Sequence, residues 1–250
     1  MNIKYFLDKF YKKVLIFFVQ KDQKNYIKLF KKFFFGAFKK SFALNNLDII
    51  INKYLNYNNG YYVEIGANDG FNQSNSLYFE IYKNWNGVLI EPLKDKFLDL
   101  KKCRSSKKNQ MFNNICAGFD FKNKNVEIIN MNLMSLSKEI NNSLNIEGHI
   151  KKYEARTKKN TKISLQKVEV LTLNRILEIA NAPHLMDILF LDTEGSELEV
   201  LKGINFKKYN FKFMCIEVRN QNEIENFLKK YNYELVKKIS HHDFLFKYMN

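Results

Sequence analysis

The sequence predicts an α/β fold built on a doubly wound, mostly parallel sheet. From residue 61 onward, short apolar runs alternate with segments of helical spacing. Buried parallel strands and the helices that cover them produce this pattern. The chain has 250 residues, of which 46% are hydrophobic, so it is long enough to bury one full core.

The expected elements of this sheet follow one another along the chain. Buried strands are predicted at 61–65, 87–90, 111–116, 188–191 and 213–218. Helices are predicted near 74–83, 94–102, 172–180, 196–203 and 221–230. Two further strand-like runs, 233–239 and 244–248, are joined by only four residues. So short a link predicts an antiparallel hairpin at one edge of the sheet.

The segment 119–170 interrupts this regular alternation. It is polar, and two strand-like pieces at 126–129 and 163–170 flank a middle rich in Asn, Ser and Lys. We expect it to be an insertion over the carboxyl ends of the strands. The predicted organisation is therefore a helical extension at 1–45 and an α/β domain at 46–250 that contains this insertion.

The first 45 residues predict two basic amphipathic helices. Apolar residues recur with helical spacing over 6–18 and again over 26–38, with lysines between them. Residues 1–45 carry 11 lysines against Asp8 and Asp22, and so hold +9 of the net charge of +15. The apolar stripes could pack on the domain or on another subunit, or they could lie on an anionic membrane surface. Periodicity leaves both interpretations open.

Composition limits the classes of function. The longest uncharged apolar stretches, such as 14–20 and 33–38, are far shorter than the roughly 20 residues that span a bilayer, so no transmembrane helix is expected. Three cysteines without a CxxC pair favour a reducing cytoplasm, with a peripheral position at the inner membrane face as a further expectation from the basic helices. Nucleic acid is not an expected partner, because few of the basic residues are arginine.

A glycine turn follows the first predicted strand, where an open α/β sheet binds nucleotide-like ligands. Gly66 and Gly70 are spaced GxxxG, and Asn68 stands where a dinucleotide site needs its middle glycine. The turn therefore favours an adenosyl ligand without phosphates. Glu64, at the end of the strand, could attract a cationic amine or sulfonium.

Carboxylates end two of the other predicted strands. Glu91 lies 21 residues beyond Gly70, where an acidic side chain can accept hydrogen bonds from both ribose hydroxyls. Asp192 and Glu194 follow the strand at 188–191. Buried carboxylates so close together are costly unless they share a proton or bind a positive group. Alternatively, or in addition, Asp192 and Thr193 cap the next helix at 196–203, and Glu194 favours its positive end.

These residues resemble the FkbM family of S-adenosylmethionine-dependent methyltransferases. The resemblance covers roughly residues 60–248 and is carried by YYVEIGANDG at 61–70, GVLIEP at 87–92, DILFLDTEGSELEVLKG at 187–203 and CIEV at 215–218. It implies a class I methyltransferase (Rossmann-like) fold, in which a C-terminal hairpin makes one of seven strands antiparallel, and it makes 46–250 the methyltransferase domain. It also implies S-adenosylmethionine as the cofactor.

The resemblance assigns roles residue by residue. The loop around the methionine part of the cofactor would be formed by Glu64, Gly66, Asn68 and Gly70. Glu91 would hold the ribose, and Asp192 and Glu194 would line the reaction edge.

The implied activity is O-methylation of a sugar or of another small-molecule or glycan hydroxyl. Asp192 or Glu194 is the expected base, with His149 and then His241 or His242 as reserves. No HExxH or paired Cys/His spacing predicts a metal site, although carboxylates could still hold Mg²⁺. Two alternatives remain: a nucleic-acid or membrane-surface binding protein on a methyltransferase-like fold, and a nicotinamide oxidoreductase, which the missing middle glycine disfavours.

Overall fold

The computed structural model describes residues 3–21, 41–131, 135–137, 139–140 and 164–249, with the single positions 148, 151 and 155. The second predicted amphipathic helix and His149 lie outside these residues. The chain divides into two compact units, one formed by Met1–Phe112 with Met186–Phe190 and the other by Asn113–Leu185 with Leu191–Asn250.

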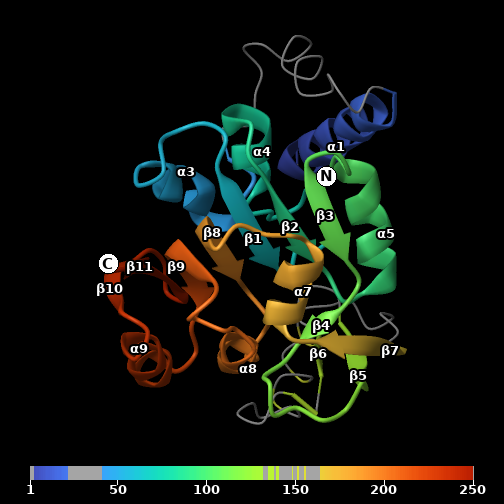
Figure 1. The fold of residues 1–250 in the computed structure, drawn as a ribbon. Coiled ribbons are helices and arrows are strands. Elements are labelled where there is room, and N and C mark those ends of the chain that lie inside the picture. The colour runs from blue at the N-terminus through green and yellow to red at the C-terminus, as the bar shows by residue number, and fades with distance from the viewer. Residues whose placement is uncertain are drawn as a thin grey trace. The chain divides into compact units, whose positions relative to one another are not determined.

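The predicted α/β fold with a seven-stranded sheet is confirmed (Figure 1). The strands of this sheet lie in the order β10-β11-β9-β8-β1-β2-β3. Their bounds are β1 Tyr61–Ile65, β2 Asn86–Ile90, β3 Asn109–Phe112, β8 Leu185–Leu191, β9 Asn210–Glu217, β10 Tyr233–Lys238 and β11 Asp243–Tyr248. Strands β1, β2 and β3 pair in parallel, whereas β11 pairs antiparallel with both β10 and β9. The predicted C-terminal hairpin is therefore confirmed.

The first unit holds the parallel strands on which the predicted cofactor turn is built. Its helical elements are α1 Ile3–Lys21, η1 Leu44–Asn46, α3 Leu47–Asn52, α4 Leu77–Lys83 and α5 Lys94–Cys103. The last four residues of both β1 and β2 are buried. Successive side chains of a strand point to opposite faces of the sheet, so both faces are covered here, as the unbroken apolar runs predict.

The second unit contains a small additional sheet, in the order β4-β7-β5-β6. Its strands are β4 Ile115–Cys116, β5 Asn125–Asn130, β6 Leu136–Ser137 and β7 Ser164–Leu171. Among the described residues, the helices of this unit are α7 Leu173–Ile179, α8 Glu197–Lys202 and α9 Gln221–Lys229. The strands predicted at 126–129 and 163–170 are confirmed as β5 and β7, which pair antiparallel.

The prediction of one strand over 111–116 is wrong. Strand β3 of the large sheet ends at Phe112, and β4 pairs with β7 in the small sheet. Asn113 and Asn114 separate the two strands, and the Asn114 side chain donates a hydrogen bond to the Glu169 carboxylate at 3.0 Å. The two polar residues inside the apolar run mark the change of sheet.

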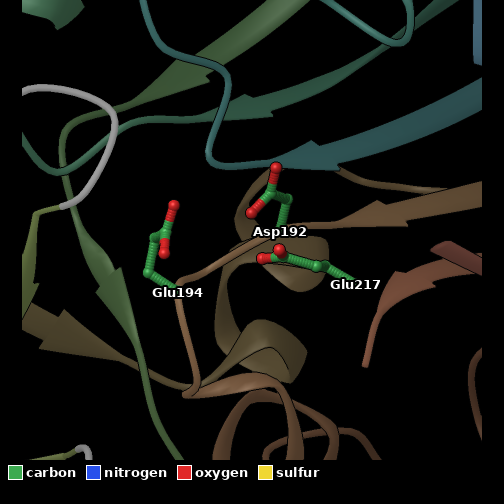
Figure 2. A group of neighbouring side chains, drawn as sticks. All are labelled: Asp192, Glu194 and Glu217. Atoms are coloured by element: carbon green, nitrogen blue, oxygen red, sulfur yellow. The ribbon is translucent and has the colours of Figure 1, made fainter. Parts of the chain in front are cut away.

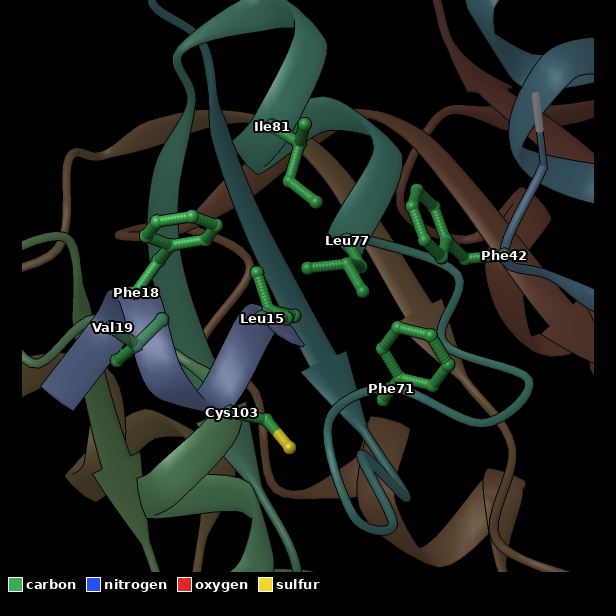
Figure 3. Packing of buried hydrophobic residues seen from close by; sticks show 8 residues of the cluster. All are labelled: Leu15, Phe18, Val19, Phe42, Phe71, Leu77, Ile81 and Cys103. Atoms are coloured by element: carbon green, nitrogen blue, oxygen red, sulfur yellow. The ribbon is translucent and has the colours of Figure 1, made fainter. Parts of the chain in front are cut away.

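The first predicted amphipathic helix is confirmed as α1, and one of its faces packs inside the first unit. Leu15, Phe18 and Val19 are buried (Figure 3). The residues buried with them come from α4, α5 and the segments before α3 and after β1: Phe42, Phe71, Leu77, Ile81 and Cys103. Among the described residues, no helix combines the length and hydrophobicity that crossing a bilayer requires.

A matched pair of leucines on α1 tests this packing. Leu15 is fully buried, whereas Leu7 is 43% exposed. Leu15→Ala should lower the free energy of unfolding by about 2 to 5 kcal/mol, because it leaves a cavity in the core. Leu7→Ala should change it by no more than about 0.5 kcal/mol. Urea denaturation of both variants measures the difference, and equal losses would show that α1 does not pack as described.

Candidate active site

The predicted glycine turn has several residues of positive φ and is hydrogen-bonded to the neighbouring strand. Gly66, Asn68 and Gly70 all have positive φ angles, of 85°, 49° and 73°. The N–H groups of Gly66 and Ala67 both donate to the Ile90 carbonyl, each at 3.0 Å. The turn therefore leaves β1 and is hydrogen-bonded to the end of β2, and asparagine occupies its middle because it tolerates the left-handed conformation better than most residues.

Gly70 is required by space as well as by conformation. A Cβ atom there would lie 2.6 Å from Cδ1 of Leu100 and 2.8 Å from Cγ of Arg104. Both neighbours are fully buried, so neither has room to move aside. A side chain at Gly70 would displace the turn from the core beneath it.

Glu91, the predicted ribose ligand, lies beside this turn in the first unit. It is buried, and its Oε2 accepts the Asn68 N–H at 2.7 Å while its Oε1 accepts the Leu93 N–H at 2.8 Å. Burial raises the pKa of Glu91 to about 7, against the opposing effect of these hydrogen bonds. A carboxylate oxygen can accept more than one hydrogen bond, which is the property that a ribose ligand needs.

Glu64, in contrast, accepts several hydrogen bonds from nearby residues of the chain. Its buried carboxylate accepts hydrogen bonds from the Ser74 hydroxyl at 3.2 Å, from the Asn75 N–H at 2.7 Å and from the Ser76 hydroxyl. Burial raises its pKa, and the nearby Arg104 guanidinium, 3.8 Å away, opposes that rise. These contacts account for its burial without a ligand, so its attraction for a cationic cofactor stays a prediction.

Asp69 is a feature of the turn that the sequence analysis missed. Its buried carboxylate accepts the N–H groups of Phe71 at 3.0 Å and Asn72 at 2.8 Å, and the ammonium group of Lys12 at 2.8 Å. Burial works against its charge, but these partners outweigh burial and lower the pKa of Asp69. An aspartate two residues before the amide that it accepts is a common turn signal, but its lysine partner could not be found from spacing.

Three carboxylates gather in the second unit, beyond the ends of β8 and β9. Oxygen atoms of Asp192, Glu194 and Glu217 all lie within 4.8 Å of one another (Figure 2). Asp192 and Glu194 were predicted to lie together, whereas Glu217 was not. Its signal was available in the CIEV motif, where an acid ends an apolar strand. Arg219 pairs with Glu194 through an Nη2 to Oε2 contact of 2.5 Å.

The alternative in which Asp192 and Thr193 cap the following helix is wrong. Helix α8 begins at Glu197, after Ser196, and no side chain caps it. Instead, the Glu197 carboxylate accepts the N–H groups of Thr193 and Gly195, both at 3.0 Å. Glu197 thus orders the loop, and Asp192 is left for another role.

The electrostatics of Asp192 suit proton transfer or cation binding. The residue remains accessible to solvent, but desolvation of its carboxylate by surrounding protein atoms, followed by the negative charge of Glu217, raises the pKa of Asp192 well above its usual value. A carboxylate with a raised pKa is an effective general base near neutral pH. Three carboxylates could equally hold a divalent cation, which prefers oxygen ligands.

The reserve histidines lie at the turn of the C-terminal hairpin. His241 and His242 are exposed, and their rings contact each other edge to face, with centroids 4.7 Å apart. The His242 carbonyl accepts the Val218 N–H at 2.8 Å, next to Glu217. The hairpin turn therefore lies alongside the strand end that bears Glu217.

Comparisons with solved structures give several distant similarities. A methyltransferase FkbM from Methylobacillus flagellatus KT has 14% identity and a TM-score of 0.44, with 76% of this chain and 44% of that chain covered. The present chain therefore spans less than half of that protein. A precorrin-6y C5,15-methyltransferase from Geobacter metallireducens GS-15 has 11% identity, a TM-score of 0.38 and coverage of 84% and 90%. A methyltransferase from Pyrococcus furiosus has 12% identity, a TM-score of 0.39 and coverage of 90% and 97%.

Sequence comparison gives the decisive result. No curated protein matches the chain significantly. Residues 64–244, however, match the model of the methyltransferase FkbM domain. This match includes the glycine turn, Glu91 and the three clustered carboxylates, and it spans well over half of the chain. The chain therefore belongs to the FkbM family of methyltransferases.

Proposed function

We propose that this chain transfers a methyl group from S-adenosylmethionine to a hydroxyl group of a sugar, a glycan or another small molecule. The observation that carries the proposal is the hydrogen bond from the Asn68 N–H to the buried Glu91 carboxylate. This hydrogen bond connects two expected parts of the cofactor site: the turn that would hold the methionine part, and the carboxylate that would hold the ribose. A turn without a middle glycine suits this phosphate-free cofactor better than a dinucleotide.

The proposed chemistry is an in-line displacement. The acceptor oxygen attacks the methyl carbon, the carbon–sulfur bond breaks, and the bonding electrons stay on sulfur, which loses its positive charge. Alignment of the acceptor behind the methyl group supplies much of the rate. A base removes the proton of the hydroxyl, and Asp192, whose pKa is raised, is our first candidate, followed by Glu194.

The test of this function is transfer of labelled methyl from S-adenosylmethionine into fractionated cell glycans, lipids and RNA. Label in a base-stable ether linkage of glycan or small-molecule fractions supports the proposal. Label found only in RNA would contradict the acceptor class, and no label in any fraction would contradict the activity.

Cofactor binding should depend on the ionisation of Glu91. Because its pKa is about 7, the fraction of anionic carboxylate rises between pH 6 and pH 8, and an anionic carboxylate accepts stronger hydrogen bonds from ribose. Affinity for S-adenosylmethionine should therefore rise over this range. Glu91→Gln should remove that rise and weaken binding at pH 8 by roughly 1 to 3 kcal/mol.

Calorimetric titration at the two pH values measures this effect. Glu127→Gln is the matched control, because Glu127 is exposed on β5. Unchanged affinity in Glu91→Gln would remove Glu91 from the site.

Catalysis should depend on the clustered carboxylates more than cofactor binding does. Asp192→Asn should lower kcat roughly 10²-fold to 10⁴-fold, because an amide keeps the shape of the side chain but cannot accept the proton. Affinity for S-adenosylmethionine should stay within a few-fold. Steady-state kinetics of Asp192→Asn, Glu194→Gln and Glu217→Gln measure the contributions. Full activity in all three would move the base elsewhere, with His149 as the next residue to change.

We further propose that α1 attaches the enzyme to an anionic membrane surface, where lipid-linked glycans would be within reach. The exposed fractions of Leu7, Phe10 and Phe17 are 43%, 48% and 54%. They recur with helical spacing on a face other than the one that packs in the core. Exposed lysines at 9, 13 and 21 accompany them, and each lysine near an anionic surface contributes about 1 kcal/mol.

The membrane proposal needs surface variants and not a truncation, because removing α1 would also remove Leu15, Phe18 and Val19 from the core. Leu7→Ser with Phe17→Ser should reduce co-sedimentation with vesicles of anionic phospholipid, and Lys9→Glu with Lys13→Glu should abolish its sensitivity to salt. Leu98→Ser is the control, since Leu98 is 49% exposed on α5. Binding that is absent, or unchanged in both double variants, would contradict the proposal.

A further inference from the structure

Lys12 joins the N-terminal helix to the cofactor turn. Its Nζ atom lies 2.8 Å from Oδ2 of Asp69 and 3.6 Å from Oδ2 of Asp99 on α5. The side chains of Lys12 and Asp69 are 19% and 6% exposed, whereas Asp99 is 43% exposed. The pair with Asp69 is therefore the one shielded from solvent. Removing one partner of a shielded ion pair costs much more stability than removing one partner of a surface pair.

Asp69 passes the effect of this contact to the backbone of the turn. Its Oδ1 accepts the N–H groups of Phe71 and Asn72, and its Oδ2 accepts the Asn72 side-chain amide at 2.6 Å as well as Lys12. One carboxylate thus holds both the residues after Gly70 and the helix outside the turn. If Lys12 loses its charge, the buried carboxylate keeps its amides but has no compensating cation.

The helix reaches the same turn through apolar packing as well. Leu15, Phe18 and Val19 belong to the buried cluster that contains Phe71, the residue directly after Gly70 (Figure 3). Lys12 of α1 contacts the residue before Gly70, and the residue after Gly70 belongs to the buried cluster that includes α1. The family match begins only at residue 64. An element outside the matched domain therefore supports the turn.

We propose that Lys12 is a positioning residue for the cofactor turn, which holds Asp69 and thereby keeps the backbone of residues 66–72 in the conformation that binds S-adenosylmethionine. The inference rests on the proposed function, because it concerns how that cofactor is bound. Asn68 has a positive φ of 49° and must aim its N–H at Glu91. Such a conformation persists only where its surroundings enforce it.

The test compares variants at Lys12 with the adjacent lysine of the same helix. Lys12→Met keeps the apolar stem and removes the charge, Lys12→Arg restores a cation, and Lys13→Met changes an exposed neighbour. Calorimetry with S-adenosylmethionine gives the dissociation constant and, through the stoichiometry, the fraction of competent protein. Lys12→Met should weaken binding about tenfold, a usual size for coupling between contacting residues. Lys12→Arg and Lys13→Met should stay within about threefold of the wild-type chain.

A merely structural role would lower the melting temperature or the competent fraction without changing the dissociation constant. Amide hydrogen exchange at Phe71 and Asn72 gives a readout that needs no cofactor, and it should be faster in Lys12→Met. Asp69→Asn removes the same ion pair from the other side, so it tests the inference even if Lys12→Met fails to fold. The double variant Lys12→Met with Asp69→Asn should bind S-adenosylmethionine no more weakly than either single variant does.

The outcomes separate the two proposals. A wild-type chain that does not bind S-adenosylmethionine overturns the proposed function. A wild-type chain that binds it, together with Lys12→Met and Asp69→Asn variants of equal affinity, overturns the role of Lys12 and leaves the function intact.

Discussion

A buried carboxylate must find hydrogen-bond donors, and the turn after β1 depends on that constraint. Glu91 accepts the Asn68 N–H, Asp69 accepts the N–H groups of Phe71 and Asn72, and Glu64 accepts the Asn75 N–H. Each bond fixes a segment of backbone that would otherwise be free to rearrange, because breaking it would leave a charge buried without a partner. Hydrogen bonds within the chain itself therefore hold the conformation of the turn.

The carboxylates beyond β8 and β9 follow the opposite principle. Desolvation and then the negative charge of Glu217 raise the pKa of Asp192, whereas the N–H groups of Thr193 and Gly195 donate to Glu197. Close carboxylates of like charge lower the stability of the fold, and proteins commonly keep such destabilising groups at functional sites. The carboxylates near the turn accept backbone N–H groups, whereas the charge of Glu217 opposes that of Asp192. This contrast divides the expected tasks into holding a cofactor and moving a proton.

Much of the fold could be predicted because apolar runs report burial directly. Strand β1 has the predicted bounds, and the hairpin of β10 and β11 followed from the short link between its strands. The break between β3 and β4 was missed because the two asparagines inside the run were outweighed by their apolar neighbours.

The contact of Lys12 with Asp69 joins residues 57 positions apart, and helical periodicity shows which face of a helix is apolar but not which group it meets. Glu217 was overlooked although the CIEV motif places an acid at the end of an apolar strand, because its nearness to Asp192 and Glu194 follows from the tertiary structure.

The central claim is that the chain binds S-adenosylmethionine. A calorimetric comparison of S-adenosylmethionine, S-adenosylhomocysteine and NAD with the wild-type chain tests it most directly. The turn has Asn68 where a pyrophosphate needs glycine, and Glu91, the expected ribose ligand, accepts the Asn68 N–H. We expect the methyl donor and its demethylated product to bind, and NAD to show no measurable heat. Binding of NAD in preference to S-adenosylmethionine, or binding of none of the three, would contradict the account.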